Sequence, residues 1–174
     1  MDFNLATTEK VIFLDFDDVI FLNSPYGGHD VFHKRRRPVD LWERLFDPGC
    51  LAVLGAIHQA HLPKYVLTTS WIDYADRSGF EAILKATWLS YVAQGLHEEW
   101  SAPQGPGMTR ADAIRRWLSD HPVGRFLVLD DEMCGVGLKG WPEAILCRVN
   151  EGLVSEHADE ADRIFRAGGG KRKT

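Results

Sequence analysis

Acidic and hydroxyl side chains follow three apolar segments of the sequence, at the point where each segment ends. They are Asp15 and Asp17 after the first segment, Thr68, Thr69 and Ser70 after the second, and Asp130 and Asp131 after the third. If the segments are neighbouring strands, the carboxylates meet at one edge of a sheet, where like charges repel by several kcal/mol unless a cation neutralises them. The pattern therefore predicts a divalent metal site. The alternative is that each Asp is a turn residue or a helix N-cap.

The types of side chain at this edge narrow the metal and the reaction. Every candidate ligand is a hard oxygen, with no paired His or Cys nearby, which favours magnesium and suggests a phosphate substrate. Asp15 and Asp17 lie two residues apart, so in an extended chain both side chains point to the same side. One carboxylate can attack phosphorus while the other transfers the leaving group's proton, and a hydroxyl of Thr68 or Thr69 can hold a phosphoryl oxygen. We expect phosphoryl transfer through an aspartyl phosphate.

The segments before these residues have the composition of buried parallel strands. Residues 10–16, 64–69, 125–129 and 144–149 are short runs rich in β-branched and aromatic side chains, apolar on both faces. Apolar residues at helical spacing predict helices over residues 51–57, 78–89, 109–121 and 155–165, and a weak strand is predicted near residues 91–92. This alternation predicts an α/β domain with a mainly parallel sheet and right-handed crossovers.

The composition is that of one soluble domain. The chain has 174 residues, of which 45% are hydrophobic and 26% charged, which is enough apolar material for one core. The net charge of −5 argues against strong non-specific attraction to nucleic acid or anionic lipid. There is no run of about 18 apolar residues, and the three cysteines form no CxxC pair, which suggests reduced thiols. We expect a cytoplasmic, non-membrane protein with one domain over residues 1–167 and a flexible basic tail over residues 168–174.

Over about residues 10–166, these motifs resemble the haloacid dehalogenase-like (HAD) hydrolase superfamily. Its first motif, Asp-x-Asp-x-(Thr or Val), is present as VIFLDFDDVI, and the resemblance implies that Asp15 is the nucleophile and Asp17 the general acid and base. It also implies that the Asp15 carboxylate and the Asp17 backbone carbonyl bind magnesium. The second motif is present as YVLTTSW and implies a phosphate-binding hydroxyl. The fourth is present as FLVLDDEM and implies metal ligation by Asp130 and Asp131.

The resemblance implies a Rossmann-like three-layer sandwich with a minimal cap, and most members are magnesium-dependent phosphatases. The third motif is usually a Lys before the fourth-motif strand, and here Arg110 is its candidate replacement; the alternative is that Arg110 is a solvated residue of the first helical turn. Asp18 stands where the superfamily commonly has Gly, and it either disfavours an anionic substrate or caps a turn. The segments TTSW, RADAIRRWLSDHP and NEGLVSEHADEADRIF are similar to a small, nearly capless branch found in bacterial, phage and RNA-repair proteins.

An insert over residues 20–49 follows the first strand and is too short for a large cap domain. Its basic run HKRRR, residues 33–37, either contacts the phosphates of a nucleotide or polynucleotide or is a solvated loop. Aromatic residues in and near the insert either stack a base or pack under the loop; they are Tyr26, Phe32, Trp42 and Trp71.

These observations predict a phosphomonoesterase that acts on a phosphorylated small molecule or on the terminal phosphate of a nucleotide or nucleic acid. The alternative function is a catalytically weak phosphate- or nucleotide-binding or regulatory module. The missing Lys and the additional Asp18 suggest this alternative.

Overall fold

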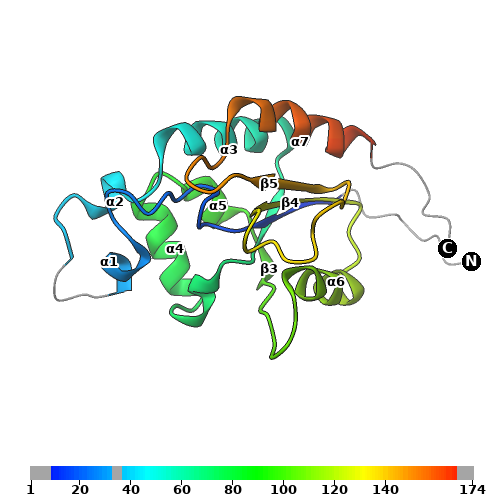
Figure 1. Ribbon diagram of the computed structural model, residues 1–174, viewed down its shortest axis with the longest axis horizontal. Coiled ribbons are helices and arrows are strands. Elements are labelled where there is room, and N and C mark those ends of the chain that lie inside the picture. Colours follow the sequence, from blue (N-terminus) through cyan, green and yellow to red (C-terminus); the bar gives the residue numbers. More distant parts are fainter. Residues whose placement is uncertain (1–8, 33–36, 168–174) are drawn as a thin grey trace, which may run out of the picture.

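A computed structural model describes residues 9–32 and 37–167. Its centre is a sheet of five parallel strands in the order β3-β2-β1-β4-β5 (Figure 1). The strands are β1 (Lys10–Leu14), β2 (Lys64–Leu67), β3 (Leu96–Ser101), β4 (Arg125–Asp131) and β5 (Ala144–Cys147). The predicted α/β class with a mainly parallel sheet is therefore confirmed.

Helices cover both faces of the sheet. The longer helices are α3 (Pro48–His61), α4 (Arg77–Ala86), α6 (Arg110–Asp120) and α7 (Ser155–Ala167), and a short helix α5 (Ser90–Gln94) precedes β3. Helices α3 and α7 lie side by side on one face and α6 lies on the other (Figure 1). The sheet divides the apolar core accordingly: Ile12 and Leu14 pack in the cluster with α3 and α7, and Val11 and Phe13 pack in the cluster with α6. This arrangement is the expected Rossmann-like three-layer sandwich.

Local sequence signals set the start of α6, which carries a candidate site residue. Thr109 is the N-cap, and its hydroxyl accepts a hydrogen bond from the Asp112 backbone N–H at 3.2 Å. The Asp112 carboxylate in turn accepts from the Thr109 N–H at 3.0 Å, which completes a capping box. The helix therefore begins with Arg110 as its first residue.

The structure corrects one predicted element. Residues 91–92 lie in α5 rather than in a strand, and the strand of this region is β3, which follows it. β3 is at an edge of the sheet and carries exposed polar residues, including Glu98 and Glu99, so its apolar pattern is weak. The tail at residues 168–174 and residues 33–36 of the basic run lie outside the described residues.

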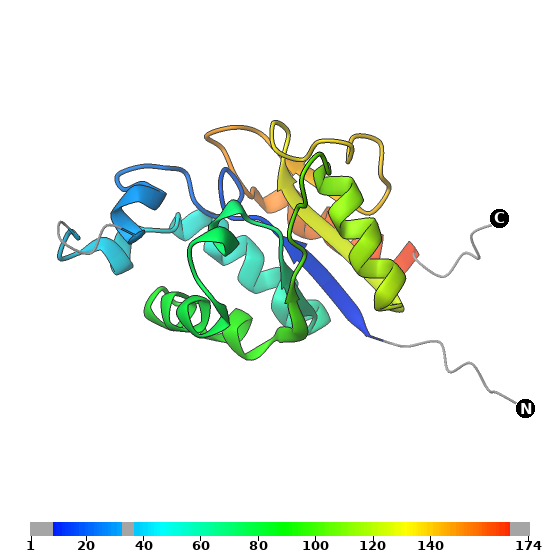
Figure 2. The same cartoon turned by 90° about the horizontal axis from the view of Figure 1, so that it is seen from below.

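The described part of the insert forms two short helices, α1 (Gly28–Phe32) and α2 (Leu41–Arg44), which stand next to α4 (Figures 1 and 2). The described part of the insert is therefore small, in agreement with the predicted minimal cap. A single turn of 3-10 helix, η2 (Ser70–Asp73), follows β2. No helix in residues 9–32 and 37–167 is long and apolar enough to cross a membrane.

Candidate active site

Asp15, Thr68 and Asp130 occupy equivalent positions on three adjacent strands. Each follows directly on a member of the paired set Leu14, Leu67 and Leu129. The backbone ladder continues past this set, because the Asp15 N–H donates to Leu129 O at 2.9 Å and the Thr68 N–H donates to Leu14 O at 3.0 Å. Residues in register point to the same face of a sheet, so these three side chains share the face on which α6 lies.

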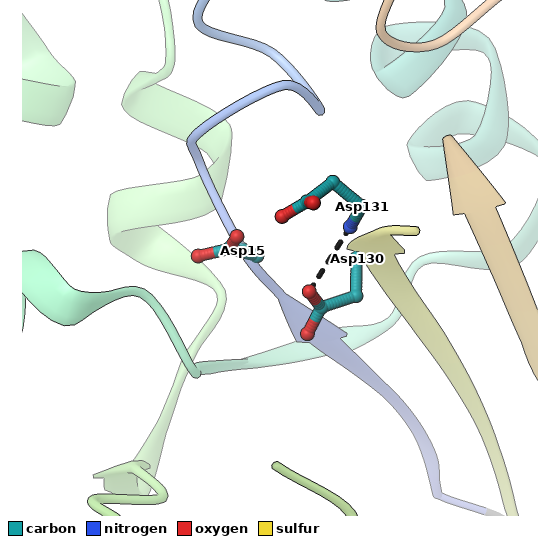
Figure 3. A group of neighbouring side chains, drawn as sticks. All are labelled: Asp15, Asp130 and Asp131. Carbon is teal, nitrogen blue, oxygen red and sulfur yellow. Dashed lines mark hydrogen bonds between the residues drawn. The ribbon is translucent and has the colours of Figure 1, made fainter. Parts of the chain in front are cut away.

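Three carboxylates meet at the carboxyl ends of β1 and β4. Asp15, Asp130 and Asp131 each offer one oxygen, and these oxygens all lie within 4.8 Å of one another. Figure 3 shows Asp15 beyond the end of β1, with Asp130 and Asp131 at the end of β4 and the Asp131 carboxylate extending toward Asp15. All three side chains are buried. The two strands therefore bring together acids that are 115 residues apart in the sequence.

Each acid of this cluster has an oxygen without a hydrogen-bond partner among the described residues: Oδ1 of Asp15 and Oδ2 of Asp130 and Asp131. The remaining oxygens of two of them are held. Asp130 Oδ1 accepts from the Asp131 N–H at 3.0 Å, and Asp131 Oδ1 accepts from the backbone N–H groups of Met133 and Cys134 at 2.7 and 2.8 Å. These hydrogen bonds fix the carboxylates of Asp130 and Asp131 in place.

Burial makes this arrangement unfavourable for three negative charges. Desolvation, followed by repulsion from Asp130, raises the pKa of Asp15 well above its ordinary value. Desolvation also raises the pKa of Asp130 to about 6, with a further increase from Asp131 and an opposing effect of Arg110. A hard divalent cation would relieve the repulsion, and carboxylate oxygens are hard ligands of the kind that magnesium binds together with water or phosphate oxygens. The residues present therefore fit the implied metal.

Arg110 reaches the acid cluster from the first turn of α6. Its Nε lies 2.8 Å from Asp130 Oδ2 and its Nη2 lies 3.6 Å from Asp15 Oδ1, and the side chain is only 5% exposed. Neither Nε nor Asp130 Oδ2 makes a well-aligned hydrogen bond, so the contact is mainly electrostatic. The alternative of a solvated first-turn Arg is wrong, because the α6 face of the sheet buries this residue.

The three candidate hydroxyls have different surroundings. Thr68 Oγ1 is buried and has no hydrogen-bond partner among the described residues. Thr69 Oγ1 accepts from the Trp71 backbone N–H at 3.3 Å and caps η2, while Ser70 is exposed. Of the three hydroxyls, the one on Thr68 therefore lies at the same register position as Asp15 and forms no hydrogen bond with the described residues.

Asp17 lies outside the three-acid cluster. The chain leaves the extended conformation after β1 and turns so tightly that the N–H of Phe21 donates to Phe16 O at 2.9 Å. Side chains of Asn23 and Trp71 donate to the Asp17 carboxylate, and burial raises its pKa against the effect of these bonds. The contact with Asn23 was not predicted from the sequence. Its only local signal is that Asn, a common turn residue, lies close to the acidic motif. The metal-binding role of Asp17, which the resemblance assigns to its backbone carbonyl, stays a prediction.

Asp18 points away from the acids and forms a long-range contact. Its φ of +53° is left-handed, and its Oδ1 accepts from the Asn150 backbone N–H at 2.7 Å. Asp15, Asp130 and Asp131 thus meet, whereas the turn after β1 leaves Asp17 and Asp18 outside their cluster. The Asp18 side chain ties this turn to the loop after β5.

Trp71 is a core residue. It is 3% exposed and packs edge-on against the rings of Phe16 and Phe21, with centroids 5.4 and 5.0 Å apart. Of the two alternatives for this side chain, packing is correct and base stacking is wrong.

Comparison with known proteins gives one finding for this arrangement. A family model described as the HAD domain in Swiss Army Knife RNA repair proteins matches residues 11–158, a range that contains every candidate site residue. No curated protein and no solved structure matches the chain.

Proposed function

The chain belongs to the family of HAD domains in Swiss Army Knife RNA repair proteins, and on that premise we propose that it is a magnesium-dependent phosphatase acting on a terminal phosphate of a nucleotide or nucleic acid. The family implies a phosphatase-type hydrolase fold. The observation that carries the proposal is the buried cluster of Asp15, Asp130 and Asp131, in which one oxygen of each acid lies within 4.8 Å of the others.

In the proposed reaction the Asp15 carboxylate attacks phosphorus, and the bond from phosphorus to the leaving oxygen breaks. Asp17 donates a proton to that oxygen, and the raised pKa of Asp17 favours the protonated form that this step requires. A water molecule then attacks the aspartyl phosphate, Asp17 accepts its proton, and inorganic phosphate leaves with Asp15 restored. The reaction thus needs one carboxyl that stays ionised and a second that changes protonation state.

Asp15, Asp130 and Asp131 would hold the magnesium ion, together with the backbone carbonyl of Asp17. When bound, the ion neutralises charge on the carboxylates and on the phosphate. Thr68 Oγ1 would donate to a phosphoryl oxygen, since no group among the described residues forms a hydrogen bond with it. The Arg110 guanidinium supplies positive charge at the same place and can pair with two phosphoryl oxygens.

The test is hydrolysis of a generic aryl phosphate by the purified protein, with and without magnesium. Asp15→Asn should lower kcat by roughly a thousandfold or more, because it removes the nucleophile. Asp18→Asn is the matched control: it is an acid of the same segment, but its side chain binds Asn150 and lies outside the cluster. Full activity of Asp15→Asn, or of wild-type protein in excess chelator, would overturn the proposal.

The substrate class is tested by a panel of phosphate esters. The name of the matching family refers to RNA repair, so we expect higher kcat/KM for oligoribonucleotides with a 5′- or 3′-terminal phosphate than for sugar phosphates. A clear preference for sugar phosphates would contradict the nucleic-acid part of the proposal and leave the phosphatase part standing.

A second candidate function is a binding module with little turnover. The close approach of Arg110 to both Asp15 and Asp130 favours it, because a guanidinium bound to the nucleophile lowers its reactivity. This candidate predicts that the protein binds phosphate or nucleotide while wild-type turnover equals that of Asp15→Asn.

A further inference from the structure

A groove of about 1220 Å³ opens between the insert and α4, separate from the buried acids. Six side chains give it its chemical character: Phe32, Arg37, Trp42, Asp73, Tyr74 and Trp100. On one side they come from α1, from α2 and from the segment between these helices, and on the other side from η2, from the residue after it and from the end of β3. Figures 1 and 2 show α1 and α2 standing beside α4, which places this groove at the insert end of the molecule.

The groove lies near the carboxyl ends of the strands, as the candidate active site does. Trp100 is close to the carboxyl end of β3, and Asp73 is four residues after Thr69. Strand β3 is two positions from β1 in the sheet, a separation of about 10 Å. About three nucleotides span such a distance at the roughly 3.4 Å spacing of a stacked strand. A strand whose end lies at Asp15 can therefore reach the groove.

The aromatic side chains of the groove present a free ring face. Tyr74 stacks on Phe32 with centroids 5.1 Å apart and ring planes inclined by 30°. Tyr74 is nevertheless 70% exposed, so its other face is open to a ligand. On the opposite wall the Arg37 guanidinium lies over the Trp42 ring at 4.9 Å. Exposed aromatic faces of this kind bind flat heterocycles, and single-stranded nucleic acids use them for base stacking.

The charges of the groove select a base rather than a phosphate. The Asp73 side chain makes no hydrogen bond or ion pair within the described residues, so its carboxylate is available to accept from an amino group on a base edge. Asp76 adds a second carboxylate, which also caps α4 through the Gly79 N–H at 2.8 Å. Two carboxylates and one guanidinium give the groove a net negative charge, which disfavours an anionic group here.

We propose that this groove binds a nucleobase of the strand whose terminal phosphate is placed at Asp15, with the base stacked on Tyr74 and its amino edge toward Asp73. The inference rests on the proposed function for the nature of the strand. It assigns to the insert a role in selecting the nucleotides next to the phosphate.

The test compares Tyr74→Ala with wild-type protein on a short oligoribonucleotide carrying a terminal phosphate and on a generic aryl phosphate. The loss of kcat/KM on the oligonucleotide should exceed the loss on the aryl phosphate by about fivefold or more, because a stacked base is lost. Tyr74→Phe keeps the ring and should match wild type. Leu62→Ala, an exposed apolar residue just before the amino end of β2, is the control for removal of exposed apolar surface.

An oligonucleotide with abasic residues next to the same terminal phosphate identifies the occupant. Wild-type protein should hydrolyse it with the lower kcat/KM that Tyr74→Ala shows on the normal strand. Equal use of the abasic and normal strands, or equal losses on both substrates in Tyr74→Ala, would overturn the inference and point to another occupant, such as a peptide.

Failure of the proposed function gives a different result. If wild-type protein hydrolyses neither substrate, binding of the phosphorylated oligonucleotide is measured by tryptophan fluorescence. Binding about fivefold tighter to wild type and to Tyr74→Phe than to Tyr74→Ala then supports the groove alone. Equal binding to all three proteins overturns the groove as well.

Discussion

Arg110 Nε lies 2.8 Å from Asp130 Oδ2, and both side chains are buried at the carboxyl edge of the sheet. The guanidinium also approaches Asp15, so one positive charge faces two buried carboxylates. Desolvation of a buried ion pair cancels much of its attraction, but the loss of one partner leaves an uncompensated charge. The contact is therefore sensitive to removal of the Arg even though it adds little stability by itself.

Arg110→Ala should lower the free energy of unfolding by about 3–5 kcal/mol in the absence of metal, because Asp15 and Asp130 lose their only nearby cation among the described residues. Urea denaturation measures this change. Arg115→Ala is the matched control on the same helix: its ion pair with Asp112 is largely exposed, and its loss should cost less than about 1 kcal/mol. Equal effects of the two substitutions would show that Arg110 does not compensate the acids. Arg110→Lys, which keeps the charge, should lie between Arg110→Ala and wild type.

Magnesium should raise the melting temperature of the wild-type protein by about 5–10 °C at a concentration near 100 times its Kd, since binding to the folded state alone shifts unfolding by mass action. Asp131→Asn should remove most of this shift by removing one ligand. Asp18→Asn should keep it, because Asp18 contacts Asn150 and lies outside the cluster. Differential scanning fluorimetry with magnesium and with chelator makes the measurement. The same shift in both variants would place the metal elsewhere.

The acid cluster should make the metal-free protein less stable as the pH rises. The pKa of Asp130 is raised to about 6, so the folded state binds a proton more tightly than the unfolded chain, whose Asp titrates near 3.8. The proton bound to Asp130 stabilises the folded state fully below about pH 4, and this stabilisation is lost as the pH rises through 6. As the pH rises from 4 to 7, the free energy of unfolding of Asp130→Asn should therefore increase by about 2–3 kcal/mol relative to that of wild type. Urea denaturation with chelator at each pH gives this difference, and a constant difference across the range would contradict the prediction.

Thr68 and Thr69 should separate activity from stability. Thr68→Val removes a buried hydroxyl that has no partner, so we expect unchanged or higher stability together with a lower kcat/KM for phosphate esters. Thr69→Val removes the N-cap bond to the Trp71 N–H and should cost about 0.5–2 kcal/mol of stability. Thermal unfolding and aryl phosphate hydrolysis, measured on both variants, test the pair. An activity loss confined to Thr69→Val would reverse the assignment of the phosphate-binding hydroxyl.

The central strands were predictable because strands that are buried on both faces are apolar on both faces, and the ends of such segments stand out in a sequence. Strand β1 places Val11 to Leu14 in the core, and a short run of apolar, β-branched and aromatic residues of this kind is typical of a buried strand. Strand β3 was not predicted in this way, because it is an edge strand with exposed Glu98 and Glu99 and lacks a run of apolar residues. Its pairing comes from backbone contacts with β2, and these leave no mark on the side-chain pattern.

The groove beside the insert was only partly accessible to sequence reasoning. Phe32 and Trp42 were candidates for base stacking, and both line the groove. Tyr74 and Trp100 were not recognised. Tyr74 lies in the segment after β2 and Trp100 lies in β3, and the two approach the insert only when the sheet brings these elements together. Trp71 was a candidate by its type, but packing against Phe16 and Phe21 removes it from the surface.

By itself, the sequence determined which side chains stand at the ends of the strands and that a helix begins near Thr109, because burial periodicity and capping act over a few neighbouring residues. Only the tertiary structure decided that β4 lies beside β1, so that Asp130 and Asp131 meet Asp15. It also decided that Asp18 turns away from them to bind Asn150, 132 positions further along the chain. Contacts over such separations depend on strand order and on the packing of whole elements, which no local pattern encodes.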